Sequence, residues 1–192
     1  MTKRSTKNAL FSSVFLGVYV MVAHAGITAM ADTQTTQATA PSKPIEQLRW
    51  LVGGVWTADA SKLPGGLARI ETRYDAAANG AVIRFTTMFF DVKNEVDNSY
   101  AGNLFFNPIV NSLSMWYIDS QNEITQGQMV AAGDKWTMSF RAPGDIVGIN
   151  QRINFRCDIL RERTDAYRWT LDAQVDSAWK RLIELEYIRS TG

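Results

Sequence analysis

The chain has 192 residues, of which 46% are hydrophobic, and it carries 20 Lys and Arg against 19 Asp and Glu, a formal charge of +1 at pH 7. Because the charges balance and no basic tract is present, nucleic acid is not expected as a partner. Cys157 is the only cysteine, so an intrachain disulfide is excluded. A chain of this size can form a sufficient core without one.

The N-terminal residues 1–31 have the order of a secretory signal peptide. Three basic residues come first: Lys3, Arg4 and Lys7. An uncharged apolar run over 9–23 follows, and then two A-x-A cleavage sites that end at Ala25 and Ala31. We favour the second site. The alternative is an uncleaved anchor, but the run is shorter than the roughly 20 residues that a bilayer core requires. We expect a periplasmic or secreted protein with no stable membrane insertion after cleavage.

Residues 32–44 are polar and lack large apolar side chains, which predicts a disordered tether. Cleavage removes His24, the only histidine, and shifts the formal charge from +1 to about −2 through the loss of three basic residues. A mature chain without imidazole cannot use Ser-His-Asp or Cys-His catalysis, and it lacks the usual ligands for zinc, copper and haem. We therefore expect no metal site and no cofactor.

One stretch, residues 44–52, has helical spacing of its apolar residues. Pro44 suits a first helical turn, and Gly53 and Gly54 end the pattern. Ile45, Leu48 and Val52 would form its apolar side. The sequence thus predicts a short N-terminal helix.

After Gly54 the apolar period becomes two, which is typical of strands with one dry face. The clearest examples are 68–74, 113–117, 136–140, 153–159, 167–171 and 183–187. Turn residues divide the domain into about ten strands, and no helix-length segment separates them, so the pairing should be antiparallel. Closing such a sheet removes its edges. We predict an all-β antiparallel barrel over residues 45–192.

The segment from Leu51 to Trp56, L-V-G-G-V-W after a short helix, resembles the G-x-W opening of the calycin group, which includes the lipocalins and fatty-acid-binding proteins, and of bacterial lipocalin-like families of unknown function. The resemblance extends to the strand count and the order of elements, and it implies a lipocalin-like barrel of unassigned function. It also implies that Trp56 closes one end of the barrel beneath an arginine of the last strand. Arg189 shares its face with Leu185 and Tyr187, so we expect it to be that arginine.

Aromatic and amide side chains on the expected inner faces are the candidate ligand-binding residues. They are Tyr100, Asn103, Tyr117, Gln128, Trp136, Phe155 and Trp169. Aromatic walls with a few polar groups are the usual form of a small-molecule site. Alternatively, the aromatic rings fill the barrel and the amides lie outside it.

These features predict an exported barrel that binds a small apolar or aromatic molecule, whose identity stays open. One alternative is a structural or interaction protein with a side-chain-filled barrel. Another is a cofactor-free isomerase, cyclase or dehydratase that uses Asp91, Tyr100 or Tyr117. For Asp91 we favour the simpler role of a turn residue.

Residues 85–90 are apolar on both strand faces, which a strand with one wet face should not be. The predicted helix, a second subunit in a homodimer or a portal rim would each explain this run, and we favour a cover or a dimer. Cys157 lies on the face of Phe155 and Ile159, so we expect a buried, unreactive thiol.

Overall fold

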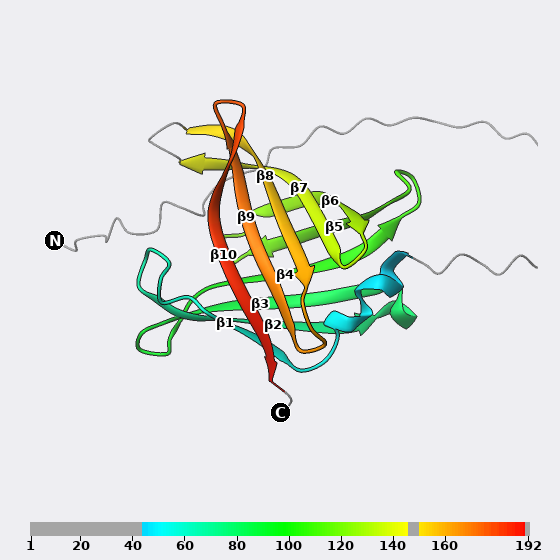
Figure 1. The fold of residues 1–192 in the computed structure, drawn as a ribbon, viewed down its shortest axis with the longest axis horizontal. Coiled ribbons are helices and arrows are strands. Elements are labelled where there is room, and N and C mark those ends of the chain that lie inside the picture. Colours follow the sequence, from blue (N-terminus) through cyan, green and yellow to red (C-terminus); the bar gives the residue numbers. More distant parts are fainter. Residues whose placement is uncertain (1–43, 146–149, 191–192) are drawn as a thin grey trace, which may run out of the picture.

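A computed structural model describes residues 44–145 and 150–190 of the chain. In this part, a 3-10 helix, η1 (Pro44–Leu51), precedes ten antiparallel strands that close into a barrel, in which β1 pairs with both β2 and β10 (Figure 1). The strands are β1 (Val55–Asp59), β2 (Leu67–Ala77), β3 (Val82–Asp91), β4 (Val96–Asn107), β5 (Ser112–Asp119), β6 (Ile124–Ala132), β7 (Lys135–Asp145), β8 (Asn150–Arg161), β9 (Ala166–Val175) and β10 (Ala178–Ser190), and a short 3-10 turn, η2 (Ala78–Gly80), joins β2 to β3.

This architecture confirms the prediction of an all-β antiparallel barrel with a short N-terminal helix. The predicted signal peptide over 1–31 and the tether residues 32–43 lie outside the described residues. Pro44, which we placed at the end of the tether, is the first residue of η1.

The N-terminal helix differs from the prediction in its period. Its buried side chains are Ile45, Leu48 and Leu51, which lie three residues apart, instead of Ile45, Leu48 and Val52. Side chains at a spacing of three lie in line on a 3-10 helix, so this geometry presents all three apolar side chains to the barrel at once. Val52 follows the helix and is only partly buried.

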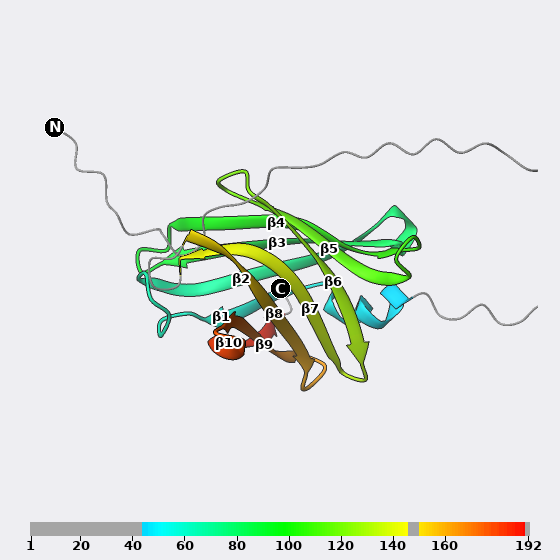
Figure 2. The same ribbon diagram turned by 90° about the horizontal axis from the view of Figure 1, so that it is seen from above.

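The two ends of the barrel carry different connections. η1 lies at the end where β2 turns into β3 and β4 into β5 (Figures 1 and 2), and we call this the plug end. At the opposite end, which we call the mouth, β1 connects to β2, β3 to β4, β5 to β6 and β9 to β10. Because the strands alternate in direction, residues late in β3 and β5 and early in β4 lie toward the mouth.

Two hairpin turns at the mouth share one local structure. The β3–β4 turn has the sequence D-V-K-N-E from Asp91, and the β5–β6 turn has D-S-Q-N-E from Asp119. In each turn the aspartate Oδ1 accepts backbone N–H groups two and four residues later, at 2.8 to 2.9 Å. The asparagine of each, Asn94 or Asn122, adopts a positive φ of 68° or 65°. Asn tolerates this left-handed conformation better than most residues, so the two turns have the same physical basis.

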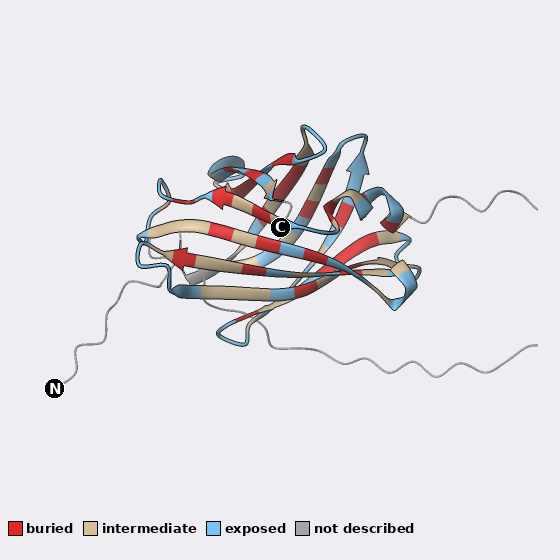
Figure 3. Ribbon diagram, turned by 90° about the horizontal axis from the view of Figure 1, so that it is seen from below, coloured by how far each residue is buried: buried red, intermediate tan, exposed pale blue. Residues whose placement is uncertain are grey.

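Buried positions alternate with exposed ones along the strands (Figure 3), so each strand has an inner and an outer face. On the outer face, the buried carboxylate of Asp172 receives a hydrogen bond from Arg156 at 2.8 Å and another from Arg181. Burial alone would raise the pKa of Asp172, but these two guanidinium groups outweigh it and hold that pKa below its usual range.

Candidate functional site

The plug end is closed by aromatic rings that contact one another around Trp50 of η1. Its ring centroid lies 5.7 Å from those of Trp56, Trp136 and Tyr167. The indole Nε1 of Trp56 donates to the carbonyl of Leu51 at 2.8 Å, which ties β1 to the helix. Trp56 and Tyr167 are fully buried, so solvent does not enter the barrel here.

Two arginines hold this plug from the barrel wall. The predicted contact is present: Arg189 is the cross-strand partner of Trp56, and its guanidinium carbon lies 4.3 Å from the Trp56 ring centroid. Arg189 also donates to the carbonyl oxygen of Trp50. A second arginine, Arg161, lies 5.4 Å from the centroid of the Trp50 ring. Burial, and then the charge of Arg161, lower the pKa of Arg189.

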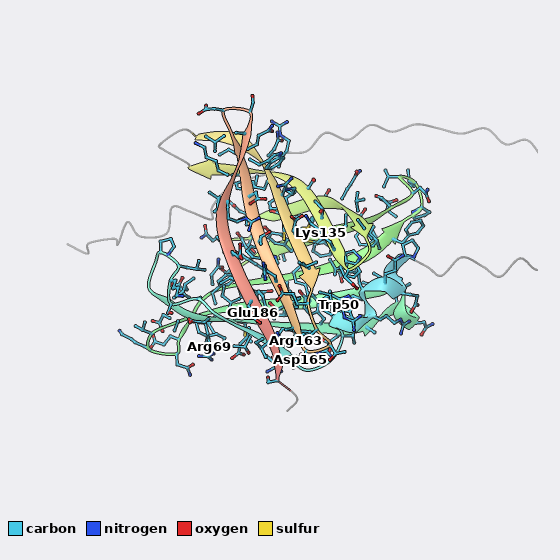
Figure 4. All side chains as sticks on the ribbon, in the orientation of Figure 1. Trp50, Arg69, Lys135, Arg163, Asp165 and Glu186 are labelled. Carbon is cyan, nitrogen blue, oxygen red and sulfur yellow. The ribbon has the colours of Figure 1, made fainter. Side chains whose placement is uncertain are left out.

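Figure 4 places the labelled Trp50 near the β8–β9 turn, where Arg163, Asp165 and Glu186 gather on the outer surface. Arg163 pairs with Asp165 at 3.4 Å and with Glu186 at 3.3 Å. These three side chains are exposed, so the pairs contribute little to stability. The plug depends instead on its buried rings and on the arginines above them.

The mouth half of the interior, from the middle of the strands to the mouth, has a wall formed by β2 to β5. Five inward-facing rings follow one another along it: Tyr74, Phe85, Tyr117, Tyr100 and Phe89. Successive centroids are 6.2, 6.4, 5.1 and 5.0 Å apart. We call this set the aromatic row.

Gly102 makes room for the centre of the aromatic row. It faces inward between Phe85 and Tyr117, as the cross-strand partner of both. A Cβ atom at Gly102 would come within 2.7 Å of the Phe85 ring and 2.6 Å of the Tyr117 Cβ. It would come still closer, 2.3 Å, to the backbone carbonyl oxygen of Trp116, so any larger residue at Gly102 would clash with β5 as well as with the Phe85 ring.

Four members of the aromatic row stay partly exposed although they face inward. Only Tyr74, the ring nearest the middle of the barrel, is buried, whereas Phe85, Phe89, Tyr100 and Tyr117 are not. The opposite wall shows the same feature at Trp169 and Ile183. Since the fully buried rings Trp56 and Tyr167 lie in the plug, the exposed ring surface of the interior lies on the mouth side.

The phenol groups of the interior are neutral at physiological pH. Burial raises the pKa of Tyr74 to about 12, even though its hydroxyl lies within hydrogen-bonding distance, 3.4 Å, of that of Tyr167. Burial also raises the pKa values of Tyr100, Tyr117 and Tyr187. The rings of the mouth half therefore present uncharged phenols to a ligand.

The structure brings together four of the seven predicted ligand-binding residues. Tyr100 and Tyr117 belong to the aromatic row, and Phe155 and Trp169 lie on the facing wall, where Phe155 stacks on Phe140 at 5.4 Å. Trp136 also faces inward, but it is buried in the plug against Trp50.

The two predicted amides do not face the interior, and this prediction is wrong. Asn103 pairs with Arg84 and Trp116 on the outer face, while its neighbours Gly102 and Leu104 point inward. Gln128 is exposed, and the next residue, Met129, takes the inward position.

The outward-facing aromatic ring of residues 85–90 is covered within the same chain, while Met88 on the same face is partly exposed. Phe85 and Phe89 face inward, whereas Phe90 faces outward and is buried beneath Arg69, whose guanidinium carbon lies 3.8 Å from the ring centroid. The predicted helix plugs the barrel end and is not this cover. A homodimer through these residues stays a prediction, but the apolar run no longer requires one.

Asp91 and Cys157, the remaining candidate residues, both have structural roles. Asp91 binds the backbone of its own turn, which confirms the role that we favoured for it. Cys157 is buried, and burial raises the pKa of its thiol, as expected for an unreactive cysteine. A hollow of about 290 Å³ beside Trp179 is lined by outward-facing side chains, including Arg141 and Asn154, and by the stacked rings Phe140 and Phe155 of the barrel wall.

In the part of the chain that the structure describes, no three His, Cys, Asp or Glu side chains gather closely enough to hold a metal ion. No helix in this part is long and apolar enough to cross a membrane. A scan against protein-family models and a search of the curated proteins both gave no match. The functional proposal therefore depends on the geometry of the barrel.

Proposed function

We propose that this chain is an exported, lipocalin-like binding protein that takes a small apolar or aromatic molecule into the mouth half of its barrel. One observation carries the proposal: inward-facing rings such as Phe85 and Tyr117 stay partly exposed, while those of the plug are fully buried. Barrels of about this size hold either a filling of side chains or one small ligand. Side-chain filling along the whole length would bury the mouth half as deeply as the plug.

The surroundings of the candidate residues favour binding over the two alternatives. An interaction protein was suggested by the apolar run at 85–90, but Arg69 covers Phe90, the buried outward-facing ring of that run. The carboxylate named for an isomerase-type enzyme was Asp91, and its Oδ1 accepts two backbone N–H groups of its own turn, which gives Asp91 a structural role. Aromatic walls with neutral phenols are suited to holding a ligand by burial and hydrogen bonds.

Membership of a lipocalin-like family and a periplasmic or secreted location are parts of the same proposal. The G-x-W segment and the contact of Trp56 with Arg189 support the first. The order of charged, apolar and small residues over 1–31 supports the second.

Native mass spectrometry tests the proposal on protein expressed with its leader and purified from the export compartment. A reproducible extra mass that is lost on denaturation is the expected result, and the subunit mass will also locate the mature N-terminus. The proposal fails if the protein is free of ligand and, in addition, does not bind a neutral hydrophobic fluorescent probe.

A further inference from the structure

We infer that the ligand of the mouth half is a small organic cation, an aromatic or alkyl ammonium, held by the faces of the aromatic row and by the carboxylate of Asp119. This inference rests on the proposed function and narrows its ligand class. It follows from three features of the mouth half: its rings, one buried acid and the charge of the adjacent turns.

The aromatic row supplies the first feature. Tyr100 lies between Phe89 and Tyr117, with centroid distances of 5.0 and 5.1 Å. Phe89 meets Tyr100 edge to face, so the rings of this group point in different directions. The face of an aromatic ring carries partial negative charge and attracts a cation within about 6 Å.

Asp119 supplies the second feature. It is the cross-strand partner of Tyr100 and only 9% exposed. Burial is the main cause of the raised pKa values of Tyr100 and Tyr117, and the negative charge of Asp119 adds to it. Oδ1 of Asp119 is occupied by the turn, but the charge of the carboxylate remains beside the phenols. A bound anion would be repelled there, whereas a cation would be stabilised.

The charge of the mouth supplies the third feature. The turn segments 91–97 and 119–123, which flank Tyr100, contain five carboxylates and one lysine. The inward-facing arginines, Arg161 and Arg189, lie at the opposite end of the barrel in the plug. On the other wall of the mouth, Lys180 of β10 shares the face of the inward-pointing Ala173, so the negative charge is concentrated on the side of Tyr100. The charge on that side attracts cations and disfavours carboxylate ligands such as fatty acids.

Three naphthalene derivatives of nearly equal size and different charge test the inference by calorimetric titration of the mature protein. They are 1-naphthylmethylamine, a cation at neutral pH, 1-naphthalenemethanol, which is neutral, and 1-naphthoate, an anion. We expect the amine to bind about tenfold or more tightly than the alcohol, as for one interaction with a charged group, and the naphthoate to bind weakest.

Asp119→Asn separates charge from turn structure, because the amide oxygen of Asn can still accept the two backbone N–H groups. We expect this variant to lose the preference for the amine and to keep its affinity for the alcohol. Asp91→Asn is the matched control, since it removes the same charge from the equivalent turn of the neighbouring hairpin, where the aspartate is not the partner of Tyr100. It should reduce the preference much less than Asp119→Asn does.

Substitution of Tyr100 separates the ring face from the hydroxyl. Tyr100→Phe should bind the amine nearly as well as the native protein, while Tyr100→Leu should bind it several-fold more weakly. Thermal unfolding of each variant shows whether it is folded before the titration.

Equal binding of the amine and the alcohol, or an unchanged preference in Asp119→Asn, would overturn the inference while leaving small-molecule binding intact. Tightest binding of the naphthoate would overturn it as well. Failure of all three compounds to bind would count against the proposed function itself.

Discussion

The plug and the mouth half are both built from aromatic side chains, yet they differ in how those rings are covered. In the plug, Trp50 of η1 packs against Trp56 and Tyr167, and Arg189 donates a hydrogen bond to the Trp50 carbonyl oxygen. The helix and this arginine together close that end of the barrel. In the mouth half, Phe89 and Tyr100 contact each other, and no helix in the described part of the chain covers them. Aromatic content alone therefore does not separate a core from a binding surface. The difference is the presence of an element that closes the end.

Truncating one ring in each half gives the largest expected effects. Trp56→Ala removes a fully buried ring and should cost about 3 to 5 kcal/mol of unfolding free energy. Phe89→Ala removes a ring that solvent already reaches, so its cost should be less than half of that. Urea unfolding followed by circular dichroism measures both. Similar losses would show that the mouth half is packed like the plug, against our interpretation.

Alkaline pH should destabilise both halves, because they share buried phenols. Burial raises the pKa of Tyr74 from about 10 to about 12, so the folded state keeps a proton that the unfolded chain releases in this range. Stability should therefore be constant up to about pH 10 and then fall, by about 1.4 kcal/mol per pH unit for each such tyrosine. Urea unfolding at a series of pH values above and below 10 measures this fall in the free energy of unfolding.

The native protein should also show little phenolate absorbance until it unfolds, since all five tyrosines of the described part have raised pKa values. Tyr74→Phe should make the loss of stability with pH less steep. If the native protein gave the phenolate signal of five ordinary tyrosines near pH 10, the phenols would not be buried as described.

Replacing Arg189, which lies over Trp56 in the plug, should lower the free energy of unfolding moderately. Arg189→Met keeps much of the aliphatic packing but removes the cation above Trp56 and the donor to Trp50, and it should cost about 0.5 to 2 kcal/mol. Arg73→Met, an exposed change on β2, is the control and should be nearly neutral. Thermal unfolding that is unchanged in Arg189→Met would remove the arginine from our explanation of the plug.

The smallest effect is expected at the mouth turns. Asn122 has a positive φ of 65°, so Asn122→Ala should cost about 1 kcal/mol, whereas Asn122→Gly should cost little. Chemical denaturation of the two variants gives the comparison. A glycine variant that loses as much as the alanine variant would mean that the side chain, and not the backbone conformation, stabilises this turn.

Most of the fold could be predicted because the barrel repeats one simple signal. Apolar residues at every second position predicted the strands, and Gly, Asn and Asp residues predicted the turns. The calycin resemblance implied an arginine of the last strand over Trp56, and parity selected Arg189. The same parity, applied to Ile159 and Arg161 on β8, would have found the second arginine. The 3-10 period of η1 was missed because Leu51 and Val52 are both apolar.

The candidate site was harder to predict because its strands lack clean alternation. β4 contains Leu104, Phe105 and Phe106 in succession, so the sequence does not say which of them face inward. Glycines occupy the inward positions 102 and 127, where an apolar side chain would have revealed the register. The pairing of β4 with β3 and β5 determines which of its residues face inward, and this pairing cannot be read from the sequence of β4 alone.

Nuclear magnetic resonance with a small neutral nitroxide as a paramagnetic probe tests most directly whether the mouth half is open and the plug closed. We expect the ring signals of Phe85, Phe89, Tyr100 and Tyr117 to broaden as the probe is added, while the indole signals of Trp56 and Trp136 stay sharp. Equal protection of both sets would mean that the barrel is filled throughout, and it would contradict the proposed binding function.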